Sequence, residues 1–204
     1  MTSILLPAFI LLLSFLLGSI PIRFLIAKAK GMDIRKFGSG NVGATNINRT
    51  LGKKAGVLTL IGDLLKGSLS VLLAGNILVS SPHLVPWAGF FAILGHCFSP
   101  FLQWKGGKGV ATSLGVFLVL SPVHTLISVV VFILVLWLSK YVSLASVAGA
   151  ISMPLSTVLY PSFFLPGVSI VAGLAACLIC YRHKANLLRL RAGSEPKFGL
   201  SVKC

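Results

Sequence analysis

The chain has 204 residues, of which 56% are hydrophobic and only 10% are charged, and its mean hydropathy is +0.98. A soluble domain carries roughly a quarter charged residues, so this composition excludes a single water-soluble core. The formal net charge of +15 raises nucleic acid as a partner. However, the Lys and Arg residues concentrate in alternate loops between apolar segments, as in membrane proteins, and we expect no nucleic acid binding.

Apolar segments near membrane-spanning length recur along the chain, each closed by a short polar or Gly/Pro-containing turn. We expect about seven passes, at residues 4–27, 55–79, 84–102, 109–121, 124–139, 142–159 and 164–181. The predicted fold class is therefore an all-α integral membrane protein, with one domain over residues 1–204. The fourth segment is short for a spanning helix, so a re-entrant hairpin there is an open alternative. The first has no basic residue before it and no cleavage pattern, so we interpret it as a pass and not as a signal peptide.

The distribution of basic residues predicts the orientation. Turns without Lys or Arg, at residues 80–83, 121–124 and 160–166, alternate with loops that contain them. By the positive-inside rule, the basic loops are cytoplasmic, the N-terminus is outside and the C-terminus is cytoplasmic. We expect loops 28–54 and 103–109 and the tail 182–204 to form the active-site face.

The loop after the first pass carries a glycine-rich run. Residues 38–46 read Gly-Ser-Gly-Asn-Val-Gly-Ala-Thr-Asn, followed by Arg49. The run contains G-x-G-x-x-G, but no strand–helix–strand unit surrounds it and Asp63 lies in an apolar segment, which excludes a dinucleotide site. Successive backbone N–H groups at a helix start favour a phosphate, with Ser39 or Asn41 as the cap and Arg49 as a second clamp. A flexible linker is the alternative.

The third cytoplasmic turn holds a second glycine-rich motif. After Gly95 and His96, residues 104–112 read Trp-Lys-Gly-Gly-Lys-Gly-Val-Ala-Thr, so that Lys105 and Lys108 flank a Gly-Gly pair. Two positive charges beside an open backbone suit a phosphate or a carboxylate, although the spacing is not that of a Walker A loop. The alternative is that both lysines only anchor the inward ends of two helices.

Polar residues also lie inside the apolar segments. Asp63 and Lys66 stand one turn apart in the second pass, where mutual pairing is the preferred interpretation and a proton or ion pathway is the alternative. We interpret His96 as a hydrogen-bonded histidine between helices. Cys177 and Cys180 lie in the last apolar segment and are interpreted as packing residues. No metal-ligand cluster is recognised, so we expect no metal.

The start of the tail is the third candidate site. At helical spacing His183, Asn186 and Arg189 share one face, while the neighbouring leucines can rest on the membrane interface. A basic membrane-surface helix would explain the arginines alone, and this alternative stays open. It does not require the histidine or the asparagine.

Three motifs together, at residues 38–49, 95–112 and 182–190, resemble the bacterial acyl-phosphate:glycerol-3-phosphate acyltransferases in order, spacing and topology. The resemblance implies an enzyme of the bacterial inner membrane whose active site faces the cytoplasm. The likeness covers essentially the whole chain and continues at Gly18, Ser19, Asp63, Lys66, Gly67 and residues 141–146.

The resemblance implies transfer of a fatty acyl group from acyl-phosphate to the sn-1 hydroxyl of glycerol-3-phosphate. The products are lysophosphatidic acid and inorganic phosphate, in the first acylation step of phospholipid synthesis, and no cofactor is implied. It places acyl-phosphate, held largely by backbone amides, at Ser39, Gly40, Asn41, Val42, Gly43, Ala44 and Thr45. It places glycerol-3-phosphate at Arg49, Lys108, His183 and Asn186. Behind these ligand-contacting residues, it places Lys105, His96 and Asn46 in a supporting position.

The residues favour direct, single-step transfer over a covalent acyl-enzyme. The only acidic residues are Asp33, Asp63 and Glu195, and neither His96 nor His183 is followed by the His-x-x-x-x-Asp spacing of many acyltransferases. Because an acyl-phosphate carries a good leaving group, alignment and charge stabilisation can carry catalysis. The expected base is a substrate phosphate oxygen, with His183 as the catalytic alternative. An organic-phosphate transporter and a structural scaffold are the rival functions, and the lack of an internal repeat argues against the transporter.

Overall fold

A computed structural model of the chain describes residues 2–29, 31, 51–160 and 167–199. Within these ranges every regular element is an α-helix or a short 3-10 helix, and no strand is present. The prediction of an all-α fold is confirmed. The chain packs as two compact units, Met1–Leu120 and Ser121–Cys204.

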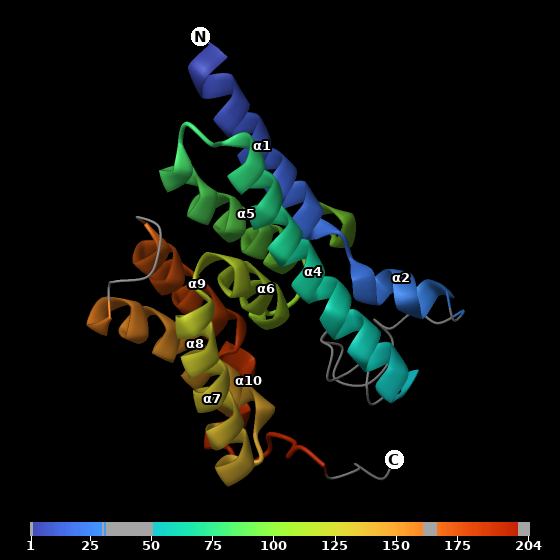
Figure 1. Cartoon of the computed structure of the whole chain (residues 1–204). Helices are drawn as coiled ribbons and strands as arrows, with labels where there is room; N and C mark the ends of the chain where they lie inside the picture. The colour runs from blue at the N-terminus through green and yellow to red at the C-terminus, as the bar shows by residue number, and fades with distance from the viewer. Residues whose placement is uncertain (1, 30, 32–50, 161–166, 200–204) are drawn as a thin grey trace. The chain divides into compact units, whose positions relative to one another are not determined.

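The first unit is built from helices whose backbones approach closely. Its elements are α1 (Thr2–Ser19), α2 (Ile22–Ala29), α4 (Lys53–Ile77), η2 (Pro82–Leu84), α5 (Val85–Cys97), η3 (Pro100–Leu102) and α6 (Val110–Leu120). Helix α1 packs against α5 (Figure 1), and α4 packs against α6. Glycines stand at these crossings, because a Cβ at Gly18 would overlap the carbonyl of Ala92 and a Cβ at Gly115 would overlap that of Leu64. Small residues at helix crossings are typical of membrane bundles.

Helix α4 shows how the first unit reverses the pattern of a soluble protein. Its buried face carries Thr59, Asp63, Lys66 and Ser70, which recur at helical spacing, while its exposed positions are largely leucine, isoleucine and valine. Apolar side chains face outward and polar groups face the helix bundle, which is the arrangement expected of a helix surrounded by lipid. Two of these side chains reach other segments: Asp63 contacts His96 of α5, and Lys66 donates to the carbonyl of Ile20.

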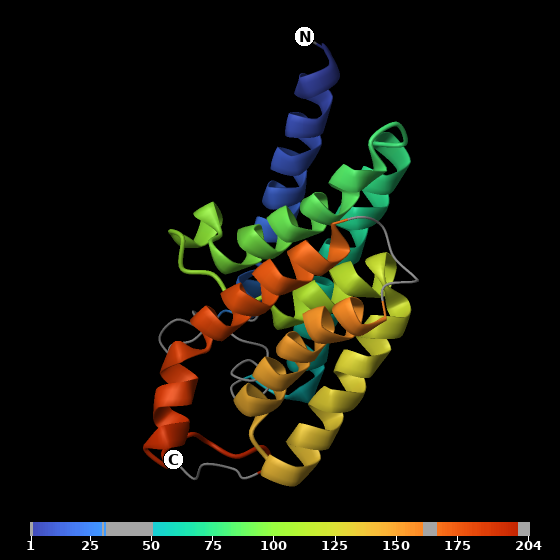
Figure 2. The same cartoon turned by 90° about the vertical axis from the view of Figure 1, so that its left-hand side faces the viewer.

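The second unit consists of a helical hairpin, a third helix and a folded-back tail. Helices α7 (Pro122–Ser139) and α8 (Val142–Leu159) run side by side, and α8 also packs against α9 (Val168–Arg182) (Figure 2). The chain then bends by 55° into α10 (Lys184–Arg191). The tail returns to the α7–α8 turn, where the backbone N–H of Phe198 donates to the carbonyl of Lys140 over 2.6 Å.

A helix is present at each of the seven segments predicted to cross the membrane. Five helical stretches among the described residues are long and apolar enough to span, and α9 with α10 makes a sixth if the bent pair is one span. Helix α6, at the fourth predicted segment, has only 11 residues and is short for a full pass. The number of passes and the orientation of the termini remain predictions.

Candidate functional site

The first predicted motif lies outside the described residues. This holds for all positions expected to bind acyl-phosphate, for the supporting Asn46 and for the clamp Arg49: Ser39, Gly40, Asn41, Val42, Gly43, Ala44, Thr45, Asn46 and Arg49. Their role stays a prediction from the sequence. The second and third motifs lie within the described ranges.

The second motif is a loop bound to the end of α5. The backbone N–H of Gly106 donates to the carbonyl of Cys97 over 3.1 Å, and that of Gly107 donates to the carbonyl of His96 over 2.9 Å. A Cβ at Gly106 would overlap the carbonyl of His96 and the backbone of Cys97. The Gly-Gly pair is therefore required by close backbone contact, which lets the loop lie flat on the last turn of α5.

Lys108 follows this flat segment at the start of α6. It is half-buried, whereas Lys105, on the other side of the glycines, is exposed. Gly109, with a φ of 85°, turns the chain into the helix that begins at Val110. The N-terminus of a helix carries a partial positive charge and unpaired N–H groups, so a lysine at this point adds to a positive potential that favours an anion. The structure thus separates the two lysines, and Lys108 is the better candidate for a phosphate.

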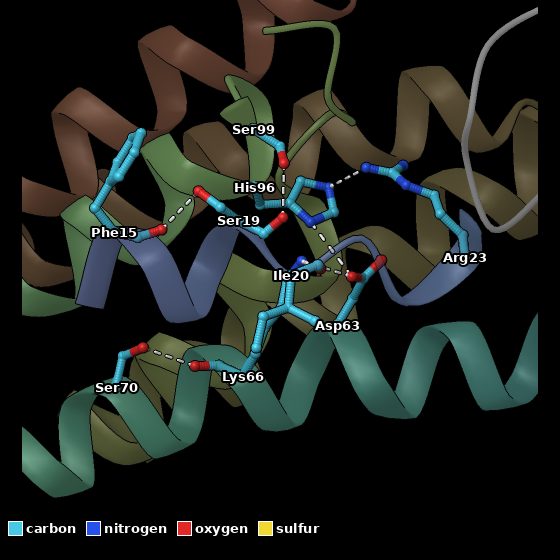
Figure 3. A network of polar contacts seen from close by, with 9 residues as sticks. All are labelled: Phe15, Ser19, Ile20, Arg23, Asp63, Lys66, Ser70, His96 and Ser99. Atoms are coloured by element: carbon cyan, nitrogen blue, oxygen red, sulfur yellow. Dashed lines mark hydrogen bonds and ion pairs between the residues drawn. The ribbon is translucent and has the colours of Figure 1, made fainter. Parts of the chain in front are cut away.

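A cluster of polar side chains lies beneath this loop (Figure 3). Asp63 and Lys66 are paired, with Lys66 Nζ 2.9 Å from Asp63 Oδ1, as predicted. His96 lies between helices, as expected, with Nδ1 3.4 Å from Asp63 Oδ1 and Nε2 3.4 Å from a terminal nitrogen of Arg23. Sequence reasoning missed Arg23. The available signal was an arginine within the largely apolar stretch Leu5–Ala29, where the only other charged residue is Lys28 near its end.

The third motif begins where α9 bends into α10. His183 is buried at this bend, and its Nδ1 lies 2.8 Å from the carbonyl of Ile179. Because a carbonyl only accepts, the ring proton is assigned to Nδ1, and Nε2 carries the lone pair. This tautomer presents Nε2 as the nitrogen that can take up a proton.

Asn186 and Arg189 lie on one side of α10, as predicted, and both bind Glu195. Asn186 Nδ2 donates to Glu195 Oε1 over 2.6 Å, and Arg189 Nε donates to Glu195 Oε2 over 2.8 Å. A carboxylate only accepts, so the amide must turn Nδ2 toward Glu195 and Oδ1 away from it. Asn186 Oδ1 is buried and has no hydrogen-bond partner among the described residues. It is therefore an acceptor that a hydroxyl donor can satisfy.

Glu195 is the residue of the third motif that sequence reasoning did not place in the site. Burial by itself raises the pKa of this carboxyl, but the polar groups of Asn186, Ser143 and Arg189 outweigh that effect and hold the pKa below its ordinary value. Glu195 is thus ionised at neutral pH. No local sequence pattern predicts the contact, because Glu195 lies nine positions after Asn186 and beyond the end of α10.

Comparisons with known proteins agree on one family. The family model described as glycerol-3-phosphate acyltransferase matches residues 8–193. A glycerol-3-phosphate acyltransferase of Trichlorobacter lovleyi is 48% identical over 185 residues, covering 91% of this chain and 94% of the relative. That of Bacillus subtilis is 46% identical over 193 residues, covering 93% of this chain and 96% of the relative.

Solved structures give the same result. The crystal structure of PlsY (YgiH), an integral membrane glycerol 3-phosphate acyltransferase in its glycerol 3-phosphate form, has a TM-score of 0.87 and 41% sequence identity. The match covers 95% of this chain and 96% of that one. The lysophosphatidic acid form of PlsY matches with a TM-score of 0.85. The chain therefore belongs to the glycerol-3-phosphate acyltransferase family and is an all-helical integral membrane protein.

Proposed function

We propose that this chain transfers a fatty acyl group from acyl-phosphate to the sn-1 hydroxyl of glycerol-3-phosphate, releasing lysophosphatidic acid and inorganic phosphate. The observation that carries the proposal is the half-buried Lys108, which follows a Gly-Gly loop at the N-terminus of α6. Family membership supports the acceptor, since the matching crystal structures are named for glycerol 3-phosphate and lysophosphatidic acid forms.

Four residues are proposed to hold glycerol-3-phosphate: Arg49, Lys108, His183 and Asn186. Lys108 supplies charge for the phosphate. The buried Oδ1 of Asn186, which is turned away from Glu195, suits a hydroxyl of the glycerol, because an amide oxygen accepts a hydrogen bond and does not attract an anion. The run from Ser39 to Thr45 is proposed to hold the phosphate of the donor through backbone amides.

The proposed reaction is a single displacement. The sn-1 oxygen attacks the acyl carbon, the bond from that carbon to the bridging oxygen breaks, and inorganic phosphate leaves with the bonding electrons. The hydroxyl proton passes to a phosphate oxygen of a substrate or to Nε2 of His183, whose Nδ1 is bonded to Ile179. Of the chain's three acidic residues, Asp63 contacts Lys66, and Glu195 binds Asn186 and Arg189. A charge-oriented triad is therefore disfavoured.

The proposed location is the inner membrane of a bacterium, with the N-terminus outside and the glycine-rich loops at the cytoplasmic face. The basis is the alternation of basic and uncharged loops. Cysteine labelling of intact cells and of inverted vesicles, with single cysteines placed at positions 49 and 105, would test this orientation. Labelling of the two positions from opposite sides would contradict it.

The deciding experiment offers the purified chain labelled glycerol-3-phosphate together with acyl-phosphate, acyl-CoA or acyl carrier protein, each separately. We expect lysophosphatidic acid only with acyl-phosphate. Production with acyl-CoA alone would overturn the proposed donor, and uptake of label into sealed vesicles without lipid formation would favour the transporter. Lys108→Ala should abolish most activity, whereas Lys140→Asn removes an exposed lysine at a left-handed position and should not.

A further inference from the structure

We infer that Arg23, Asp63, Lys66 and His96 form a floor that positions the loop carrying Lys108. The four side chains come from α2, α4 and α5, and each is at most 4% exposed. The inference rests on the proposed function only through the role given to Lys108. It assigns to Arg23 and His96 an effect on substrate binding without contact to the substrate.

The contacts of the cluster form a chain from α4 to α2. Lys66 lies against Asp63, Asp63 lies against Nδ1 of His96, and Nε2 of His96 faces Arg23 (Figure 3). The arrangement favours a neutral imidazole that carries its proton on Nδ1, toward the carboxylate, and accepts on Nε2 from the guanidinium. Asp63 thereby contacts the ammonium of Lys66 directly and is connected to the guanidinium of Arg23 through His96. Pairing of this kind is how buried charges in an apolar bundle are stabilised.

The same cluster fixes the end of α1. Lys66 Nζ donates to the carbonyl of Ile20 over 3.0 Å, and Ser99 Oγ donates to the carbonyl of Ser19 over 2.7 Å. The last carbonyls of a helix have no partner within the helix, so the Ser99 bond satisfies that of Ser19, while Lys66 holds Ile20, the residue that follows α1. Helices α1, α4 and α5 are thus held together at the level from which the loop leaves α5.

The loop lies directly on the cluster. Gly107 donates to the backbone carbonyl of His96, and a Cβ at Gly107 would overlap Nε2 of His96 and both terminal nitrogens of Arg23. The residue that precedes Lys108 therefore rests against the imidazole and the guanidinium. Removing either group leaves space next to Gly107. The backbone at Lys108 then loses the side-chain contacts that fix its position relative to α2 and α5.

The test is a double-mutant cycle in which Arg23→Gln is combined with Lys108→Ala. We expect Arg23→Gln to raise KM for glycerol-3-phosphate roughly 10- to 100-fold, the effect of a misplaced binding group, with a smaller change in KM for acyl-phosphate. If Arg23 acts through Lys108, the double variant should be no worse than Lys108→Ala alone. Arg23→Lys keeps a donor toward His96 and should restore part of the loss.

Ser70→Ala is the matched control. Ser70 is buried on the same face of α4, and within the described part of the chain its hydroxyl donates to the carbonyl of Lys66 in its own helix. We expect it to leave both KM values unchanged. Thermal unfolding of every variant in detergent separates positioning from destabilisation, because a structural role would lower Tm and multiply with the Lys108 effect.

The outcomes distinguish the two proposals. If Lys108→Ala raises KM for glycerol-3-phosphate but Arg23→Gln behaves like Ser70→Ala, the positioning role is wrong and the proposed function stands. If Lys108→Ala changes nothing, the role of Lys108 in the proposed function is wrong. Should Arg23→Gln fail to accumulate, Arg23→Lys and His96→Gln enter the same cycle, and multiplicative effects for both would overturn the inference.

Discussion

Asp63 and Glu195 are both buried carboxylates, but they hold their partners in different ways. Asp63 lies within the apolar first unit and contacts Lys66 on its own helix and His96 on α5. Glu195 lies on the tail of the second unit and binds Asn186 and Arg189 of the neighbouring α10. The first carboxylate joins distant parts of the chain, whereas the second sets the direction of nearby side chains. Loss of Asp63 should therefore affect folding first, and loss of Glu195 should affect the site first.

Asp63→Asn should produce the largest effect. The substitution keeps the shape but leaves the Lys66 ammonium buried without a counter-charge, which costs about 3–5 kcal/mol of folding free energy. Thermal unfolding in detergent would measure the loss. The double variant Asp63→Asn, Lys66→Met removes both charges and should recover part of it. No recovery would mean that the pair is not the reason for the loss.

Lys108→Ala should come next and should separate the two lysines of the second motif. Loss of a half-buried charge at the start of α6 is expected to lower kcat/KM roughly 100-fold, whereas Lys105→Ala, at an exposed position, should lower it only a few-fold. Steady-state assays with both substrates varied would give the ratio. Equal effects would support the alternative that both lysines only anchor the inward ends of two helices.

Glu195→Gln should show the orienting role of the second carboxylate. The variant loses charge-assisted hydrogen bonds and allows the Asn186 amide to turn, so we expect about 2 kcal/mol of lost stability. KM for glycerol-3-phosphate should also rise, because Oδ1 of Asn186 is no longer held away from position 195. A stability loss without any change in KM would contradict the orienting role.

The pH dependence of stability measures the contribution of the Glu195 carboxylate to folding. The folded-state pKa of Glu195 lies below the ordinary value of 4.5. The unfolded state therefore binds the proton more readily, so the stabilising contribution of Glu195 is present above about pH 4.5 and is lost as pH falls through the lowered folded pKa. The Tm of the wild type should fall in that acidic window, and the Tm of Glu195→Gln should fall less. Parallel curves would show that other groups control acid stability.

Ser99→Ala should have the smallest effect. It removes one hydrogen bond to the carbonyl of Ser19 and should cost about 1 kcal/mol, with little change in kcat. Thermal unfolding would detect it as a small decrease in Tm. A large loss of activity would mean that the end of α1 contributes to the site more than the Arg23, Asp63, Lys66 and His96 cluster does.

The contrast between the two carboxylates also explains what the sequence could predict. Apolar runs of spanning length gave the helices, and the spacing of Asp63 and Lys66 gave their pairing, because both patterns are local. Arg23 was missed because its partner His96 is 73 positions away. Contacts of that separation depend on helix packing, which single-sequence patterns do not specify.

The third motif shows the same limit at shorter range. Helical spacing correctly placed Asn186 and Arg189 on one side of α10, but it gave no reason to bring Glu195 back onto them. That contact depends on the tail returning to the α7–α8 turn, where Phe198 bonds Lys140. The bend of 55° at His183 likewise has no Pro or Gly to predict it.

Isothermal titration of glycerol-3-phosphate into the purified chain would measure directly whether Lys108 holds the phosphate of the acceptor. We expect saturable binding by the wild type, binding weakened at least about ten-fold in Lys108→Ala, and unchanged binding in Lys140→Asn. Equal affinity in Lys108→Ala and wild type would contradict the claim that the glycine loop at the start of α6 presents the charge that holds the acceptor's phosphate.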